Sequence, residues 1–316
     1  MATSLVSILI PCHNAAPWLA QTLESALAQT WPQTEIIVVD DGSSDDSAGL
    51  ARTFIPRGIR LVEQPNRGAS AARNTAVAAA RGDYLQFLDA DDLLAPDKLE
   101  QQMKLAAATA DADAVLCGTW SRFTHTPADG DFTPQPLCAD AAPIDWVVTK
   151  FEQNAMMHPA AWLTPRALAG RAGPWDESLS LDDDGEYFTR VVLASRGVRF
   201  CREAVSYYRS GLPGSLSGTK SERAWASAFR SLELSSARLL AQEDTPRTRQ
   251  ACATAFQHFI YESYPRAAEC RSRATACVTA LGGSPLPPPG GPKFRWARRL
   301  LGWRLAKRLQ ESLHRH

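Results

Sequence analysis

The feature that most constrains the fold of this chain is a pair of apolar runs that each end in a cluster of carboxylates. Ile36-Ile37-Val38-Val39 leads into Asp40-Asp41-Gly42-Ser43, and Tyr84-Leu85-Gln86-Phe87-Leu88 leads into Asp89-Ala90-Asp91-Asp92. A short apolar run bounded by turn residues is typical of a strand buried in a parallel sheet. Ligands bind at the carboxyl ends of the strands in open α/β sheets, so both clusters are expected at that edge. Acids gathered there repel one another unless a cation or a hydrogen-bond donor compensates them.

Strand-like and helix-like segments alternate through the first 118 residues. The apolar patterns predict strands at 6–10, 36–39, 59–63, 84–88 and 114–118, and helices at 18–29, 47–54, 69–80 and 96–109. We expect Pro11 to end the first strand, because proline lacks the N–H that a sheet uses. The alternation predicts an α/β fold with a mostly parallel sheet flanked by helices on both faces.

The rest of the chain divides by composition. Residues 119–218 show a looser pattern, 219–281 read as a helical extension, 282–292 as a Pro/Gly linker and 293–316 as a basic tail. The tail holds eight lysines and arginines against one glutamate, and the chain as a whole has no net charge. The first 292 residues are therefore acidic, which argues against a nucleic-acid partner.

Cysteine usage and hydropathy indicate the compartment. The seven cysteines are odd in number and form no CxxC pair, which is typical of reduced thiols in a cytoplasmic protein. We expect no signal peptide, and no apolar stretch of about 18 residues predicts a spanning helix. The basic tail at 293–316, with its tryptophans and leucines, predicts peripheral contact with the inner face of an anionic membrane. Its apolar positions form no single stripe at helical spacing, so a docked or disordered C-terminus is the alternative.

Four sequence elements follow one another at compatible spacing. They are Ile10-Pro11-Cys12-His13-Asn14, Val39-Asp40-Asp41-Gly42-Ser43, Asn66-Arg67-Gly68-Ala69-Ser70-Ala71-Ala72-Arg73-Asn74 and Asp89-Ala90-Asp91-Asp92. Together they closely resemble the inverting family 2 glycosyltransferases, strongly over 4–118 and more weakly to about 218. The resemblance implies a GT-A fold, which is Rossmann-like and binds nucleotide-diphospho-sugars. We therefore expect a GT-A domain over 1–218, with a nucleotide-binding half at 1–118 and an acceptor-binding half at 119–218.

The resemblance places the nucleotide sugar against the first three elements. Asp41 is expected to accept the N3–H of uracil or thymine, which cytosine lacks, and Pro11 and Asn14 would shape the wall of the same pocket. A turn and helix cap is the alternative for Asp41. Either Arg67 or Arg73 would reach the nucleotide or its diphosphate, although Arg73, in an Ala-rich helix, fits a buried salt-bridge partner equally well.

The fourth element matches the DxD pattern that the family uses for ribose and metal. In an extended segment alternate side chains share a face, so Asp89 and Asp91 can both face the cleft, with Ala90 between them. The resemblance implies that Asp91 is the direct ligand of Mg²⁺ or Mn²⁺ and that Asp89 contacts the ribose or the waters of the metal. One or two carboxylates plus ligand phosphates are a usual way to hold such an ion. A helix cap is the alternative for these acids.

A third acidic cluster, Asp182-Asp183-Asp184, precedes Tyr187 and Phe188. On its own a charge run reads as a solvated loop. The resemblance aligns Asp183-Asp184 with the acidic pair whose second member is the general base of the family, which makes Asp184 the candidate. The first member is usually Glu and here is Asp183, and Asp182 leaves the register open by one residue. An inverting transfer needs one base and no enzyme nucleophile.

Two further features concern the acceptor side of the expected site. His158 would line the acceptor site, or else serve as a structural residue among apolar neighbours. Arg209 with residues 210–217 resembles the loop that closes over the diphosphate in many relatives. The histidine often found in that loop is missing here, which makes a third protein ligand to the metal doubtful.

The sequence as a whole predicts a metal-dependent inverting glycosyltransferase that uses a UDP-sugar. It would transfer a hexosyl or N-acetylhexosaminyl group to a glycan or lipid-linked acceptor, in surface polysaccharide biosynthesis. Alternatives are a dTDP-sugar-dependent transferase, or a non-catalytic glycan- or membrane-binding protein on the same scaffold. A sugar nucleotidyltransferase would need a Gly-rich basic loop after the first strand, where Pro11-Cys12-His13-Asn14 stands.

Overall fold

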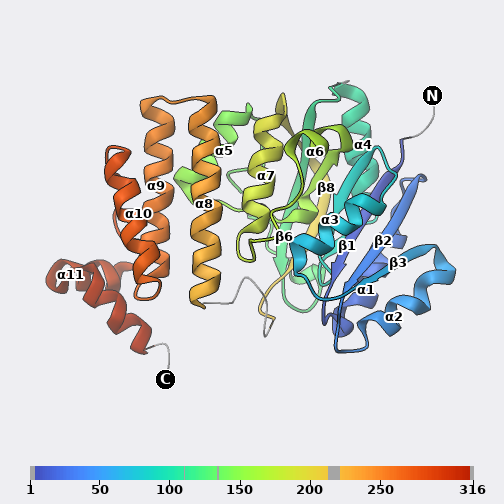
Figure 1. Ribbon diagram of the computed structural model, residues 1–316, viewed down its shortest axis with the longest axis horizontal. Helices are drawn as coiled ribbons and strands as arrows, with labels where there is room; N and C mark the ends of the chain where they lie inside the picture. The colour runs from blue at the N-terminus through green and yellow to red at the C-terminus, as the bar shows by residue number, and fades with distance from the viewer. Residues whose placement is uncertain (1–3, 110, 134, 213–220, 314–316) are drawn as a thin grey trace.

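The computed structural model describes residues 4–109, 111–133, 135–212 and 221–313. One twisted sheet runs through the α/β part, helices cover both of its faces, and a group of long helices lies beyond its end (Figure 1). The strands are β1 Val6–Cys12, β2 Thr34–Asp41, β3 Ile59–Gln64, β4 Tyr84–Phe87, β5 Leu93–Leu94, β6 Ala114–Phe123, β7 Trp162–Pro165 and β8 Gly197–Arg209. The helices of the α/β part are α1 Ala16–Leu27, α2 Ser47–Phe54, α3 Ala69–Ala79, α4 Lys98–Thr109, α5 Pro143–Gln153, α6 Arg166–Ala172 and α7 Asp183–Ala194.

The first half of the sheet is parallel, as the sequence predicts. β1 pairs with β2 on one side and with β4 on the other, and β2 pairs with β3. Contrary to the sequence-based expectation, Pro11 does not end β1, which continues to Cys12. The Leu9 carbonyl accepts a bond from Leu88 N, one residue beyond the end of β4, so Pro11, two residues further along β1, faces the side where β4 has already ended. The N–H that proline lacks therefore has no ladder partner to lose.

The second half makes the sheet mixed rather than parallel throughout. The strand order is β3-β2-β1-β4-β7-β6-β8-β5, with β7 antiparallel to both β4 and β6, and β5 antiparallel to β8. The ten-residue strand β6 pairs in parallel with β8 and extends beyond the predicted 114–118. The loose pattern of 119–218 therefore hides regular elements, namely α5, β7, α6, α7 and β8. The α/β class is confirmed.

Alternate residues of the central strands serve two cores on opposite faces of the sheet. Ile8 and Ile10 pack with Leu19 and Leu23 of α1, while Leu9 packs on the other face with α3 and α7. This period-two alternation places α1, α2 and α4 on one face and α3, α5 and α7 on the other. The strands are consequently fixed in register, and so are the loops at their carboxyl ends.

The predicted C-terminal helical region is confirmed. It consists of α8 Glu222–Gln242, α9 Pro246–Ser263 and α10 Ala268–Ala280, whose inward residues form a separate core around Phe229, Phe256 and Phe259. Residues 282–291 have no regular structure, and Leu286 lies against this core, where its carbonyl accepts a bond from the Tyr261 hydroxyl at 3.0 Å. The tail then forms α11, Pro292–Leu313.

Candidate active site

Asp41, at the end of β2, holds the loop that leads into α3. Its carboxylate is almost fully buried and accepts hydrogen bonds from Arg67 N at 2.9 Å, Gly68 N at 2.7 Å and Gln64 Nε2 at 2.7 Å. Gly68 has φ of +92°, a conformation that a residue with Cβ rarely adopts. A carboxylate has about four lone-pair directions, so Asp41 keeps room for one more donor.

Asn14 ties the loop after β1 to the loop after β2. Its Oδ1 accepts from Ser44 N at 2.8 Å, and its N–H donates to Ser43 Oγ at 3.0 Å. Pro11 is buried inside β1, one strand away from Asp41. The two residues thus lie at the carboxyl edge of the sheet with Asp41, in the region where the sequence predicts a pocket wall.

Arg73, on α3, joins the two acidic clusters. Its guanidinium is buried and binds Asp89 Oδ1 and Asp183 Oδ2, each at 2.8 Å, with its face 4.5 Å from the Trp175 ring centre. Burial disfavours the charged guanidinium, but Asp89 and Asp183 favour it more strongly, so the pKa of Arg73 is raised. Of the two readings left open by the sequence, the structure places Arg73 as the buried ion-pair partner.

Arg67 lies at the surface of the same region. Its side chain is 56% exposed and pairs with Glu177 Oε2 at 2.7 Å. Nearby, Asn74 exchanges hydrogen bonds with the backbone of Trp175, at 3.0 and 2.8 Å. These contacts fasten the segment before α7 onto α3, and Arg67 remains the more accessible of the two arginines.

The turn after β4 presents Asp89 and Asp91 on a rigid base. The Ala90 carbonyl accepts a bond from Thr22 Oγ1 of α1 at 2.9 Å. Asp92 is fully buried and accepts from Arg209 N at 2.8 Å, while its other oxygen lies 3.1 Å from His158 Nδ1. Hydrogen bonds to α1 and β8 therefore fix the turn, and its conformation does not depend on the side chains of Asp89 and Asp91.

Asp91 is the least compensated carboxylate of the turn. Burial, and then the negative charges of Asp92 and Asp89, raise the pKa of Asp91 to about 8. A backbone N–H and the charge of Arg209 compensate this carboxylate only in part, whereas Asp89 has the ion pair with Arg73. Such an oxygen donor fits a hard divalent cation, which would relieve the repulsion. Within the described ranges no three His, Cys, Asp or Glu side chains form a metal site, so ligand phosphates would complete the coordination.

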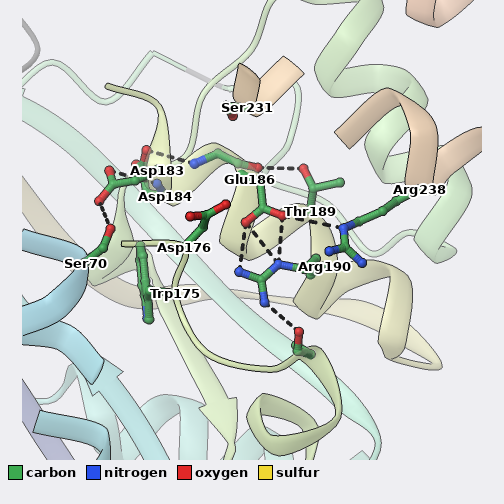
Figure 2. A network of polar contacts seen from close by, with 12 residues as sticks. Ser70, Trp175, Asp176, Asp183, Asp184, Glu186, Thr189, Arg190, Ser231 and Arg238 are labelled. Carbon is green, nitrogen blue, oxygen red and sulfur yellow. Dashed lines mark hydrogen bonds and ion pairs between the residues drawn. The ribbon is translucent and has the colours of Figure 1, made fainter. Parts of the chain in front are cut away.

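Asp183 and Asp184, at the N-terminus of α7, have different surroundings (Figure 2). Asp183 Oδ2 accepts from Ser70 Oγ at 2.8 Å and from Arg73, and its Oδ1 accepts from Asp184 N at 3.0 Å. Asp184 stays partly exposed, and its side chain accepts from Gly185 N at 2.8 Å. Burial, and then the charges of Asp183 and Asp182, raise the pKa of Asp184 to about 7. Asp183 is thus occupied with structure, while Asp184 is available to take a proton near neutral pH.

Glu186 and Arg190 anchor this end of α7. Their side chains are buried, with Arg190 Nε 2.8 Å from Glu186 Oε1 and its second nitrogen 2.8 Å from Oε2 (Figure 2). Arg190 also donates to the Ala172 carbonyl at 2.6 Å. The paired geometry fixes the direction in which the helix presents Asp184.

His158 is a structural residue rather than part of an acceptor site. It is fully buried, with Nδ1 toward Asp92 and Nε2 2.9 Å from Ser206 Oγ. Burial lowers the pKa of His158 to about 3, so the ring is neutral at physiological pH. The expected closing loop is described only as far as Leu212, and residues 213–217 of that expectation lie outside the described residues.

We expect His158→Ala to lower the free energy of unfolding by about 2–4 kcal/mol, because it removes the ring that contacts the buried Asp92 Oδ2 and Ser206 Oγ and leaves a cavity in its place. Urea denaturation measures the change, and the exposed His125→Ala serves as the control, with an expected change below about 0.5 kcal/mol. Equal stability of the two variants would contradict the structural role.

Several site residues escape prediction from the sequence. Ser70 and Asn74 lie inside the third sequence element, but spacing alone does not show that Ser70 contacts Asp183 or that Asn74 bonds to Trp175. The same holds for Asp92, whose partners are far along the chain. Trp175, whose ring lies against the Arg73 guanidinium, has no signal in the third element. Only the folded chain brings these segments together.

Known proteins similar to this chain are glycosyltransferases. Residues 7–137 match the family model described as glycosyl transferase family 2. Glycosyltransferase GlyG of Streptococcus pneumoniae is 28% identical over 71% of this chain and 76% of its own length. The uncharacterized glycosyltransferase EpsJ of Bacillus subtilis is 31% identical over 67% of this chain, which spans only 62% of that relative.

Solved structures share the fold. S. aureus TarS residues 1–349, in complex with UDP-GlcNAc, superimposes with a TM-score of 0.64 at 15% identity, covering 98% of this chain and 92% of TarS. The mannosyltransferase PcManGT from Pyrobaculum calidifontis, in complex with GDP-Man and Mn²⁺, gives 0.52 at 17% identity, covering 100% and 89%. The fold is the GT-A fold, and the relatives named above are glycosyltransferases. Residues 7–137 belong to glycosyltransferase family 2.

Proposed function

We propose that this enzyme transfers a sugar from a UDP-sugar to an acceptor hydroxyl with inversion at the anomeric carbon, and that Asp184 is its general base. The observation that best supports this is the chain of contacts from Asp89 through Arg73 to Asp183, the neighbour of Asp184. It brings the donor-side acids and the one partly exposed acid with a pKa of about 7 into the same site. Inversion by direct displacement needs that single base, with no covalent intermediate.

In this proposal Asp91, assisted by Asp89, holds Mg²⁺ or Mn²⁺. When bound there, the ion would neutralise negative charge at the diphosphate. The chain's own residues do the rest: the Ala90 turn positions Asp91, Arg73 fixes Asp89, and Asp184 accepts the proton of the acceptor hydroxyl. The Mn²⁺ in the PcManGT complex supports a divalent ion in this fold.

The proposed donor is a UDP-sugar, with a hexosyl or N-acetylhexosaminyl group. The remaining acceptor capacity of Asp41 suits the N3–H of uracil, and TarS binds UDP-GlcNAc in the same fold. A dTDP-sugar offers the same N3–H and is the rival donor. Pro11, Asn14 and Arg67 would line the base and diphosphate.

UDP with Mn²⁺ should raise the melting temperature by about 4 °C at a hundredfold excess over its dissociation constant, since a ligand that binds only the folded state stabilises it. CDP should raise it far less, because cytosine has no N3–H to donate to Asp41. Thermal-shift measurements with UDP, dTDP, CDP and GDP, each with Mn²⁺, test the donor class. A larger shift with CDP or GDP than with UDP would refute it.

We further propose a glycan or lipid-linked acceptor, in surface polysaccharide synthesis on the cytoplasmic side of the membrane. All seven cysteines are free, as is usual in a reducing compartment. Among the described residues, no helix is both long enough and apolar enough to cross a bilayer. A radiolabelled sugar followed from UDP into membrane extracts or isolated glycans would identify the acceptor. Hydrolysis of the donor without any transfer would leave the acceptor proposal without support.

A further inference from the structure

Helix α11 is divided at Gly302, which has φ of 74° and ψ of 155°. Each half carries the same pattern, Arg295-Trp296 with Arg299-Leu300 before the break, and Arg304-Leu305 with Arg308-Leu309 after it. Positions four apart lie on one face of a helix, so each half presents an arginine pair beside an apolar pair. The break resets the helical phase, which explains why the sequence shows no single continuous stripe.

The opposite side of α11 is packed on α9 and its surroundings. Phe294 and Ala306 are buried, and the Trp303 ring lies 5.1 Å from the Tyr261 ring and 5.0 Å from the Tyr264 ring. Lys307 Nζ donates to the Tyr261 carbonyl. This docking fixes which side of each half faces outward, at the end of the molecule beyond α9 and α10 (Figure 1).

The outward side exposes an unusual amount of apolar surface. Trp296 is 68% exposed, Leu300 65%, Leu305 47% and Leu309 48%. Of the eight large apolar side chains exposed in the described part of the chain, five belong to α11. Single exposed leucines are ordinary, but several gathered on one element mark an interaction surface.

The charges beside these side chains define the partner. Residues 294–310 contain six arginines and lysines and no acid, and Arg295 and Arg299 form no ion pair within the described ranges. A second copy of the same face would bring like charges together, which disfavours self-association through it. Nucleic acid would satisfy the arginines but leave the leucines and Trp296 in water. An anionic lipid surface satisfies both, with apolar side chains in the acyl boundary and guanidiniums at the headgroups.

We propose that the outward face of α11, formed by Arg295, Trp296, Arg299, Leu300, Arg304, Leu305 and Leu309, docks on an anionic membrane surface; the Arg308 guanidinium lies 5.7 Å from the Tyr264 ring centre, toward the docked side. This surface is independent of the active site, and its test needs no sugar donor. The full-length protein should sediment with vesicles of phosphatidylcholine containing phosphatidylglycerol, but not with phosphatidylcholine alone. Binding should weaken steeply with salt, because each arginine at such a surface contributes about a fivefold gain in affinity before screening.

A matched pair of double variants distinguishes binding through this face from nonspecific binding through other exposed apolar side chains. Leu305→Ser/Leu309→Ser removes side chains that are 47% and 48% exposed, and Ile55→Ser/Phe132→Ser removes two that are 47% exposed elsewhere. The first pair should reduce vesicle affinity by about tenfold or more, since inserted leucines supply the apolar part of the binding. The second should bind like the wild type. Circular dichroism of both variants confirms that the fold is retained.

Tryptophan fluorescence gives a second readout. Trp296 is the one exposed tryptophan among the nine, all of which are described. Brominated phosphatidylcholine mixed with phosphatidylglycerol should quench its emission on binding, and Trp296→Phe should lose the quenching while still sedimenting. The proposal is overturned if the protein fails to bind anionic vesicles, if both leucine and control variants bind equally, or if Trp296 is not quenched.

Discussion

Asp184→Asn should lower the turnover number by about 10²–10⁴-fold, which is the usual contribution of a general base. The amide keeps the volume of the side chain but cannot accept the proton of the acceptor hydroxyl. Donor affinity should stay nearly unchanged, because Asp184 makes no contact with Asp41, Asp89 or Asp91 in the hydrogen bonds of the site. Steady-state kinetics together with UDP binding by calorimetry separate a loss of chemistry from a loss of binding.

The pH dependence provides an independent check on the same residue. A base with a pKa of about 7 is active when ionised, so kcat of the wild type should be full above pH 7 and fall about tenfold per pH unit below it. The Asp184→Asn variant should lack this acid limb. Asp183→Asn is the control for register. Because it removes a partner of buried Arg73, it should mainly destabilise the fold. Loss of the acid limb in Asp183→Asn alone would move the base by one residue.

Asp91→Asn should reduce transfer by about 10³-fold or more and should abolish the response of the protein to Mn²⁺. The reason is that Asp91 is the proposed direct ligand, and a bound cation stabilises the charge that develops at the diphosphate by several kcal/mol. Excess EDTA should reduce the transfer activity of the wild type by a similar factor. Transfer assays with and without EDTA, and melting curves with and without Mn²⁺ and UDP, measure both effects.

Asp91→Asn should make the metal-free protein more stable, although it lowers the transfer activity. Burial and neighbouring acids raise the pKa of Asp91 to about 8, above its unfolded value, so its ionisation costs stability as pH rises from about 4 toward 8. Removing that carboxylate should therefore raise the melting temperature of the metal-free protein at pH 7.5. An inactive variant that is more stable than the wild type cannot owe its inactivity to unfolding. Full activity of Asp91→Asn, or full activity in EDTA, would refute the metal role.

Much of the α/β fold is predictable because its signals are local. The run 36–39 and the acids after it place Asp41 at a strand end, and the structure has β2 ending at Asp41. Helix 47–54 is predicted with the bounds that α2 shows. The sequence misjudges Pro11 because the tolerance of proline depends on where a neighbouring strand stops, and no local pattern reveals that.

The site is less predictable because its contacts join distant segments. Arg73 contacts Asp183, 110 residues away, and Asp92 contacts Arg209, 117 residues away. Residue type narrows the set of candidate catalytic acids, but the packing of the helices decides which acid is paired with an arginine and which is free to act as the base. The difference between the surroundings of Asp183 and those of Asp184 therefore depends on tertiary packing, and so does the buried position of His158.

The double contact of Arg73 also bears on how this enzyme can evolve. One guanidinium serves Asp89 and Asp183 through two separate nitrogens, and a lysine ammonium, a single point charge, could not reproduce that fork. A change at 73 alone would leave Asp89 and Asp183 without the cation that they share, and a change at 89 or 183 alone would leave Arg73 with one carboxylate instead of two. A joint change would avoid both imbalances. Among homologous sequences these three positions are therefore expected to covary, and a lone substitution at any of them would mark a lineage in which the site has been rebuilt or given up.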